Sequence, residues 1–327
     1  MKKALTILIL VFVAALLFAK GSTESSAKTY TLKFGTVLSE TDPMYQGLQQ
    51  FQKNVNEKTN GVVKVELYSG GQLGSDEDVL EQAKIGAGVG VITDPGRMSN
   101  YIRDFGILGG PYLASDYEES LSVMDTSVYK SMADKFADYG FKILSFNWFQ
   151  GSRNLYTKNP VSKPSDLRGQ RIRSSGSEIV TRSLEAMGAN TTVLPWSEAY
   201  QALQQKVIEG VEVHNSAAYG SSIHEVTNYV SLTGHFQLLT GLVISNDWFN
   251  RLPADCQAIL VEEAYNAGKY ASDLIVAKDK EFLQMCIDGG VKLVECDRQA
   301  FIEATKSVYD RLGYGDMKRQ IDKELGR

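Results

Sequence analysis

Apolar residues along the chain alternate between two spacings, one typical of strands and one typical of helices. Every second position is apolar at 30–34 and 63–67, which predicts strands, whereas 45–58 has one apolar face and predicts a helix. A second helix is expected at 76–85 and a short apolar strand at 89–93. This strand–helix–strand order predicts an open α/β sheet.

The pattern continues with a helix at 123–139 and a strand at 141–146, and the chain is then expected to enter a second lobe near 149–153. A second α/β set follows, with strands at 170–173, 191–194 and 211–213, a helix to Met187 whose capping box is Ser175 and Glu178, and a helix to Lys206 capped by Ser197.

The final third predicts a return to the first lobe. A strand is expected at 238–245, a helix of more than 30 residues from Pro253 to about Asp288, then a strand at 291–294 and two amphipathic helices, the first capped by Asp297. Three crossings imply two hinged lobes around a cleft, formed by 28–150 plus 238–278 and by 151–237 plus 279–327. A helix of this length could span both lobes, and ligands of α/β sheets bind at the carboxyl ends of strands.

The N-terminus has the pattern of a signal peptide. Lys2 and Lys3 precede an apolar run from Ala4 to Ala19, which is short for a membrane span, and cleavage after Ala19 or after Ala27 would suit the flanking residues. Residues 1–27 are therefore predicted to be a signal peptide and tether, with an uncleaved anchor as the alternative. Export into a periplasm-like compartment follows.

Charge and cysteine content narrow the function. The net charge of −5 becomes −7 without residues 1–27, and no basic run is present, which argues against nucleic-acid binding. Three cysteines cannot all pair within one chain, so Cys286 and Cys296 either bridge or, like Cys256, are buried thiols. Their spacing fits no metal site, and we expect neither metal nor cofactor.

Two arginines lie where the second lobe should meet the cleft. Arg173 ends a short predicted strand, and its guanidinium could pair with a carboxylate through two parallel hydrogen bonds. Arg153, at the expected crossing, could supply a second cation or brace Arg173. The alternative for Arg173 is an ordinary surface salt bridge.

Aromatic and acidic residues complete the set of candidates. Trp196 could cover the apolar part of a ligand or pack between lobes, and Trp148 near the crossing allows the same two interpretations. Asp94 is a candidate for orienting a ligand across the cleft, whereas Asp76 stands at a helix start, where acids are more often caps.

Enzyme motifs are not evident. The three histidines, at 214, 224 and 235, make no metalloprotease pattern, and the chain has no nucleophile-elbow or P-loop motif. The G-x-G within 86–90 lacks the third glycine of a dinucleotide fingerprint. These observations favour a binding protein over an enzyme.

Several motifs together resemble one family. In order, they are G-G-Q-L-G at 70–74, G-P-Y-L at 110–113, G-S-R at 151–153, D-L-R-G-Q-R-I-R at 166–173, M-G-A-N-T-T-V-L-P-W-S-E-A-Y-Q-A-L-Q-Q at 187–205 and L-T-G-H at 232–235. In this order and spacing the chain resembles the solute-binding subunit of a tripartite ATP-independent periplasmic (TRAP) transporter.

The resemblance implies an α/β, two-lobed periplasmic-binding-protein-like fold with a hinge and a long helix spanning both lobes. It implies a periplasmic, monomeric receptor that binds a small organic acid and delivers it to integral membrane TRAP permease subunits. Arg173 would pair with the carboxylate, Arg153 would assist, Trp196 would line the pocket, and Asp94 would be an acidic pocket residue.

The chain departs from the family pattern at Val213, where relatives often have asparagine, and at Val89. The pocket is therefore predicted to be less polar than a sugar-acid site. Two other functions stay open at this stage, a carboxylate receptor for an ABC transporter or a sensor kinase, and an enzyme on the same scaffold.

Overall fold

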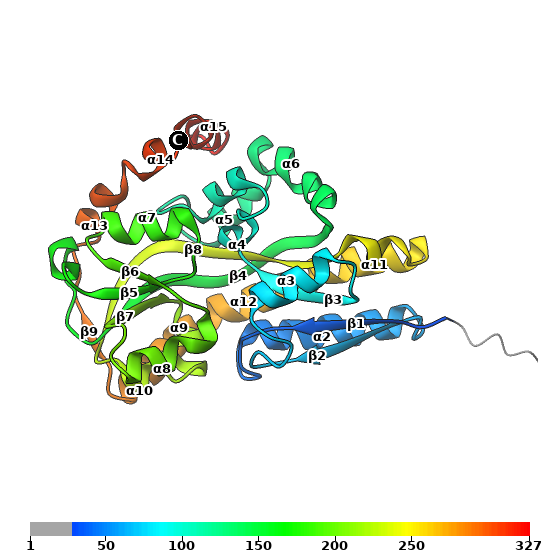
Figure 1. The fold of residues 1–327 in the computed structure, drawn as a ribbon, viewed down its shortest axis with the longest axis horizontal. Coiled ribbons are helices and arrows are strands. Elements are labelled where there is room, and N and C mark those ends of the chain that lie inside the picture. Colours follow the sequence, from blue (N-terminus) through cyan, green and yellow to red (C-terminus); the bar gives the residue numbers. More distant parts are fainter. Residues whose placement is uncertain (1–27) are drawn as a thin grey trace, which may run out of the picture.

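One continuous mixed sheet runs through both lobes. The computed structural model describes residues 28–327, and in this part of the chain the sheet has the order β2-β1-β3-β8-β4-β7-β5-β6, with β9 paired to β8 (Figure 1). The strands are β1 (Tyr30–Gly35), β2 (Val63–Tyr68), β3 (Val89–Thr93), β4 (Phe141–Thr157), β5 (Arg171–Ser174), β6 (Asn190–Val193), β7 (Gly210–Val213), β8 (Tyr229–Ser245) and β9 (Lys292–Val294).

Two long antiparallel strands join the lobes. The segments predicted at 141–146 and 238–245 are parts of β4 and β8, which have 17 residues each and pair along most of their length. Register shifts interrupt this pairing between Phe149 and Gly151 and between Arg153 and Leu155, where the strands pass from one lobe to the other. The two-lobed α/β fold is thus confirmed.

Helices cover both faces of the sheet (Figure 1). They are α2 (Pro43–Lys58), α3 (Asp76–Lys84), α4 (Pro95–Met98), α5 (Tyr117–Met124), α6 (Ser127–Ala133), α7 (Glu178–Ala186), α8 (Ala199–Gln204), α9 (Asn215–Gly220), α10 (Ile223–Val226), α11 (Asn246–Asn250), α12 (Ala254–Asp288), α13 (Arg298–Thr305), α14 (Val308–Arg311) and α15 (Gly315–Glu324). Four short 3-10 helices are η1 (Arg103–Gly109), η2 (Asp134–Tyr139), η3 (Pro164–Leu167) and η4 (Trp196–Glu198).

Three predictions about helix boundaries were wrong. The expected helix at 123–139 is broken into α5, α6 and η2, because Thr126 accepts a hydrogen bond from the Tyr129 amide and starts a new helix. Neither Ser175 nor Ser197 caps a helix, since α7 starts after Ser177 without a side-chain cap and 196–198 forms the 3-10 turn η4.

The 35-residue helix α12 crosses the molecule behind the sheet and packs against α2, β4 and α9, so it contacts both lobes (Figure 1). Trp148 is fully buried beneath it. Its ring donates to the Ala264 carbonyl at 3.1 Å, and a Cβ at Gly47 or Gly268 would approach the ring within 2.8 Å. Gly47 on α2 and Gly268 on α12 therefore let these two helices pack closely against the indole.

The C-terminal helix α15, expected in the second lobe, contacts residues that are expected in the first. Glu324 on α15 accepts from the Ser127 amide at 2.8 Å, and the Tyr314 hydroxyl donates to the Arg103 carbonyl at 2.8 Å, so α15 packs on the first lobe.

All three cysteines are free thiols, so Cys286 and Cys296 form no disulfide. The predicted signal peptide and tether, 1–27, lie outside the described residues, within which no helix is long and apolar enough to cross a membrane.

Candidate functional site

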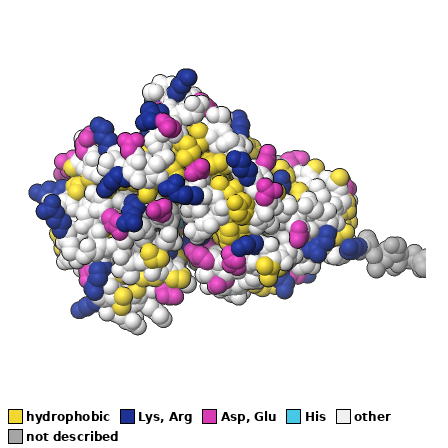
Figure 2. Space-filling model, turned by 45° about the horizontal axis from the view of Figure 1, so that its top comes forward, with side chains coloured by type: hydrophobic (Ala, Val, Ile, Leu, Met, Phe, Trp, Pro, Cys, Tyr) yellow, Lys and Arg dark blue, Asp and Glu magenta, His cyan; other side chains and the backbone are white. Residues whose placement is uncertain are grey.

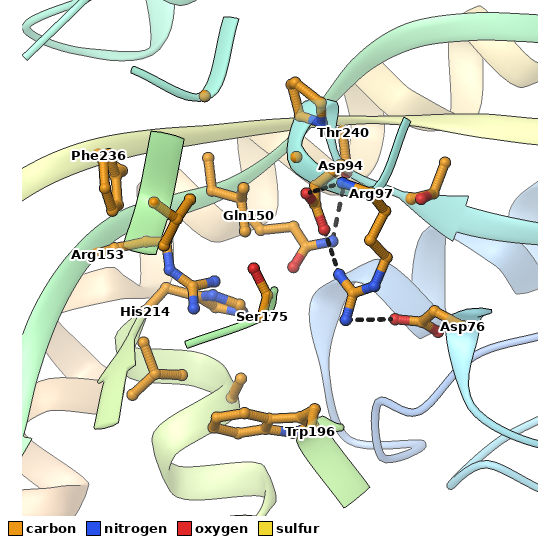
Figure 3. A pocket seen from close by; sticks show the side chains of 18 of the residues that line it. Asp76, Asp94, Arg97, Gln150, Arg153, Ser175, Trp196, His214, Phe236 and Thr240 are labelled. Carbon is orange, nitrogen blue, oxygen red and sulfur yellow. Dashed lines mark hydrogen bonds and ion pairs between the residues drawn. The ribbon is translucent and has the colours of Figure 1, made fainter. Parts of the chain in front are cut away.

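A cleft of about 860 Å³, including its opening to solvent, lies between the lobes (Figure 3). The first lobe lines it with residues that end or follow β1 and β3, such as Thr36 and Asp94, and the second lobe with residues near the ends of β5 and β7, such as Arg173 and His214. The carboxyl ends of these strands therefore face the cleft from both sides, as predicted.

Arg173 is a buried cation without an acidic partner among the described residues. Only 2% of its surface is exposed, its Nε donates to the Leu194 carbonyl at 2.9 Å, and its Nη2 has no hydrogen-bond partner in residues 28–327. Burial, followed by repulsion from Arg97, lowers the pKa of Arg173 to about 10. The guanidinium is still charged at neutral pH and lines the cleft.

Trp196 supports Arg173 from the neighbouring turn. The Arg173 guanidinium carbon lies 5.5 Å from the centre of the Trp196 ring, within cation–π range, and the indole donates to the Ser221 hydroxyl at 3.1 Å. Trp196 also lines the cleft, which is the position predicted for it (Figure 3).

Arg153 is already paired within the second lobe. It forms a double hydrogen bond with the Glu212 carboxylate, and its Nη2 also donates to the Glu212 carbonyl at 2.7 Å. Both side chains line the cleft. Glu212 was missed at the sequence level, because nothing in the sequence marks a pairing between residues 59 positions apart.

Arg97, also missed at the sequence level, is surrounded by acids on the first-lobe wall. It forms ion pairs with Asp94 and, at 3.4 Å, with Asp76 (Figure 3). It also pairs with Glu77 at 2.7 Å. Burial alone lowers the pKa of Arg97, but these carboxylates outweigh it and raise the pKa above its usual value. Its charge is compensated inside the protein.

The pKa values of the two predicted acids of this wall are shifted in opposite directions. Burial raises the pKa of Asp76 to about 6, although Arg97 partly opposes this. Burial also disfavours the charged form of Asp94, but Arg97 and its backbone amide outweigh burial, so the pKa of Asp94 stays below its usual range. Asp94 caps α4, whereas Ser75, not Asp76, caps α3.

The remaining predicted residues are divided between the cleft and the core. Val213 lines the cleft as expected, next to His214. Trp148 does not line it: its ring lies under α12, so its prediction as a ligand contact is corrected to core packing. Gln150, two residues along β4, points into the cleft instead, and its amide donates to the Thr240 hydroxyl at 3.3 Å (Figure 3).

Comparisons with known proteins agree with this geometry. Residues 34–316 match the model of bacterial extracellular solute-binding protein, family 7. The chain is 27% identical over 296 residues to the C4-dicarboxylate-binding periplasmic protein of Rhodobacter capsulatus. The aligned region covers 89% of each chain.

Two solved structures are similar to this one, with a match that covers 90% of this chain and 99% of each of the other chains. A TRAP periplasmic solute-binding protein from Ochrobacterium anthropi with bound L-fuconate is 31% identical, with a TM-score of 0.86. An open apo TRAP protein from Escherichia fergusonii is 35% identical, with a TM-score of 0.78. The chain belongs to bacterial extracellular solute-binding protein family 7, and it is similar to the periplasmic solute-binding proteins of TRAP transporters.

Proposed function

We propose that this protein captures a small organic acid in the interlobe cleft, with the ligand carboxylate on Arg173. The observation that carries the proposal is the difference among the three arginines of the cleft. Arg97 and Arg153 have acidic partners, whereas Arg173 has none among residues 28–327 and one of its nitrogens has no hydrogen-bond partner there. A buried charge is costly unless paired, so a carboxylate ligand would supply the missing partner.

Closure of the lobes removes water from this pair and strengthens it. In a water-poor cleft, a guanidinium and a carboxylate attract each other far more strongly than on a surface. Micromolar affinity requires about 8 kcal/mol, which one such ion pair, a few hydrogen bonds and the contact with Trp196 can supply together. The similarity to L-fuconate-bound and C4-dicarboxylate-binding relatives supports an organic acid as the ligand.

The N-terminal signal peptide directs export of the protein to the periplasm. There the protein delivers the bound acid to a TRAP membrane permease. We propose that the protein acts as a monomer and without catalysis. Neither His214 nor His235 is hydrogen-bonded to a carboxylate in the described part of the chain. Figure 2 shows acidic and basic side chains interspersed over one face, without a basic stripe, which supports the absence of nucleic acid among its partners.

Substitution of Arg173 tests the proposal. Arg173→Ala should weaken carboxylate binding at least about 30-fold in calorimetry, because losing one partner of a buried charge pair costs about 2–5 kcal/mol. The matched control is Arg171→Ala two residues earlier, whose exposed side chain pairs with Glu209 and should leave affinity unchanged. Undiminished affinity in folded Arg173→Ala protein would contradict the proposal.

Ligands for this test come from a thermal-shift screen of organic acids, sugar acids, keto acids and amino acids, since a ligand that binds only the folded protein raises its melting temperature.

A further inference from the structure

His214 is a second buried group of the cleft that lacks a partner. It follows β7 directly, only 3% of its surface is exposed, and its ring lies beside Arg153 where the second lobe faces the cleft (Figure 3). Both ring nitrogens have no hydrogen-bond partner among residues 28–327. Two buried polar atoms without partners are costly, and they are rare in folded proteins.

His235 shares this feature only in part, because its Nε2 alone lacks a hydrogen-bond partner among the described residues. His235 is also fully buried near Arg153, but its Nδ1 is within 2.7 Å of the Thr233 hydroxyl and it does not line the cleft. His214 lines the cleft and has neither nitrogen bonded, so a ligand in the cleft is the group best placed to satisfy it.

The chemistry of the imidazole determines what it can recognise. Burial, and then the charge of Arg153, lower the pKa of His214 well below its usual value, so the ring is neutral at physiological pH. A neutral imidazole has one N–H donor and one bare nitrogen that accepts. A carboxylate only accepts, so it cannot use the bare nitrogen, whereas a hydroxyl group can donate to it.

We propose that His214 is a specificity-determining residue that binds a hydroxyl group of the ligand, and that the ligand is therefore a hydroxylated monocarboxylate. This inference rests on the proposed function, with the carboxylate on Arg173. The side chains of Gln150, Ser175 and Thr240 add further hydrogen-bonding groups to the same cleft. The pocket is thus more polar than Val213 alone suggested.

The charges of the cleft favour one carboxylate over two. Arg173 is the cleft arginine without an acidic partner in the described chain, whereas Arg97 and Arg153 are occupied by acids. A second carboxylate on the ligand would meet Asp76 and Asp94 on the opposite wall. Hydroxyl groups can bind there without repulsion, since a carboxylate accepts hydrogen bonds from them.

Matched pairs of acids test the inference. Affinities of gluconate and hexanoate, and of 2,3-dihydroxybutyrate and butyrate, are measured by calorimetry on the wild type and on His214→Leu. The wild type should prefer at least one hydroxylated member at least tenfold, and His214→Leu should reduce that preference below threefold without weakening the deoxy acid. His224→Leu is the control, because His224 stacks on Tyr219 outside the cleft.

The outcomes separate this inference from the proposed function. An equal loss for both members of a pair in His214→Leu would mean that His214 serves the carboxylate or the fold, and would overturn the inference. Carboxylates that bind without a hydroxyl preference would overturn it and leave the proposed function standing. Binding of no acid in these pairs or in the broader screen would overturn both.

A second measurement keeps the test valid if His214→Leu does not fold. The wild type labelled with ¹⁵N-histidine has three imidazoles to observe. Gluconate or 2,3-dihydroxybutyrate should shift the ring nitrogens of His214, and the matched deoxy acid should shift them less. Equal shifts with both members, or none, would contradict the inference.

Discussion

Arg173 and Arg97 face the same cleft from opposite lobes, and they differ in their partners. Arg97 pairs with Asp76, Glu77 and Asp94, whereas Arg173 contacts a backbone carbonyl and the face of Trp196. Arg97 therefore holds its own lobe together, and Arg173 is available for an anion. A buried charge therefore indicates a binding site only when the protein does not itself neutralise it.

Removal of Arg97 should destabilise the folded protein more than any other substitution proposed here. Arg97→Met should lower the free energy of unfolding by about 3–5 kcal/mol, because three carboxylates lose their shared counter-ion. Urea unfolding followed by circular dichroism measures this. Carboxylate affinity of the folded variant should fall far less than in Arg173→Ala, and a variant as stable as wild type that no longer binds would reverse the roles of the two arginines.

The pH dependence of stability sharpens the description of the first-lobe wall. The pKa of Asp76 is raised to about 6 from an ordinary value of 3.8, so its protonated form favours the folded state. Its contribution is fully present below about pH 4 and is lost as pH rises through 6. The stability of the wild type relative to Asp76→Asn should therefore fall by at most about 3 kcal/mol between pH 4 and pH 7.

The control for that measurement lies two residues away on α3. Asp78 is hydrogen-bonded to Ser75, which lowers its pKa, so Asp78→Asn should show the opposite sign, with a contribution lost on acidification below about pH 4. A pH profile of Asp76→Asn that is parallel to the wild type in urea unfolding would show that Asp76 stays ionised.

Trp196 should contribute less to ligand affinity than Arg173. Trp196→Leu should weaken carboxylate binding about 3–10-fold, since a cation–π contact contributes about 1 kcal/mol, while Trp196→Phe should retain most of the affinity. Calorimetry on both variants checks this. If the phenylalanine variant lost as much as the leucine variant, the bond of the indole to Ser221, and not the ring face, would be the cause.

The fold was predictable because its elements carry strong local signals. The expected helix from Pro253 to Asp288 is α12 almost residue for residue, and the short strands around Arg173 and Val213 lie within one residue of their predicted bounds. The break within the expected helix at 123–139 was not predictable from the sequence. Thr126 can lie inside a helix or cap one, and the packing of α5 and α6 decides between these two positions.

The site was predictable only in part, because pairing across the fold leaves no local signal. Arg173 and Trp196 were proposed from a strand end and a helix mouth together with the resemblance to the family, yet Arg97 and Glu212 depend on partners brought together by the sheet. Trp148 and Gln150 are two residues apart on β4, where regular alternation would place both side chains on one face. The register shift between Phe149 and Gly151 interrupts this alternation, and Trp148 serves the core whereas Gln150 serves the cleft. His214 matched no motif, since its importance lies in a missing partner.

The shared strands β4 and β8 also have a consequence for how the molecule loses its structure. Each strand contributes its two halves to different lobes, and α12 covers both, so neither lobe owns a complete sheet or a separate core. Melting one lobe would strip hydrogen-bonding partners from the other. The two halves can therefore tilt relative to each other as they open and close, but they should denature together, as a single cooperative unit.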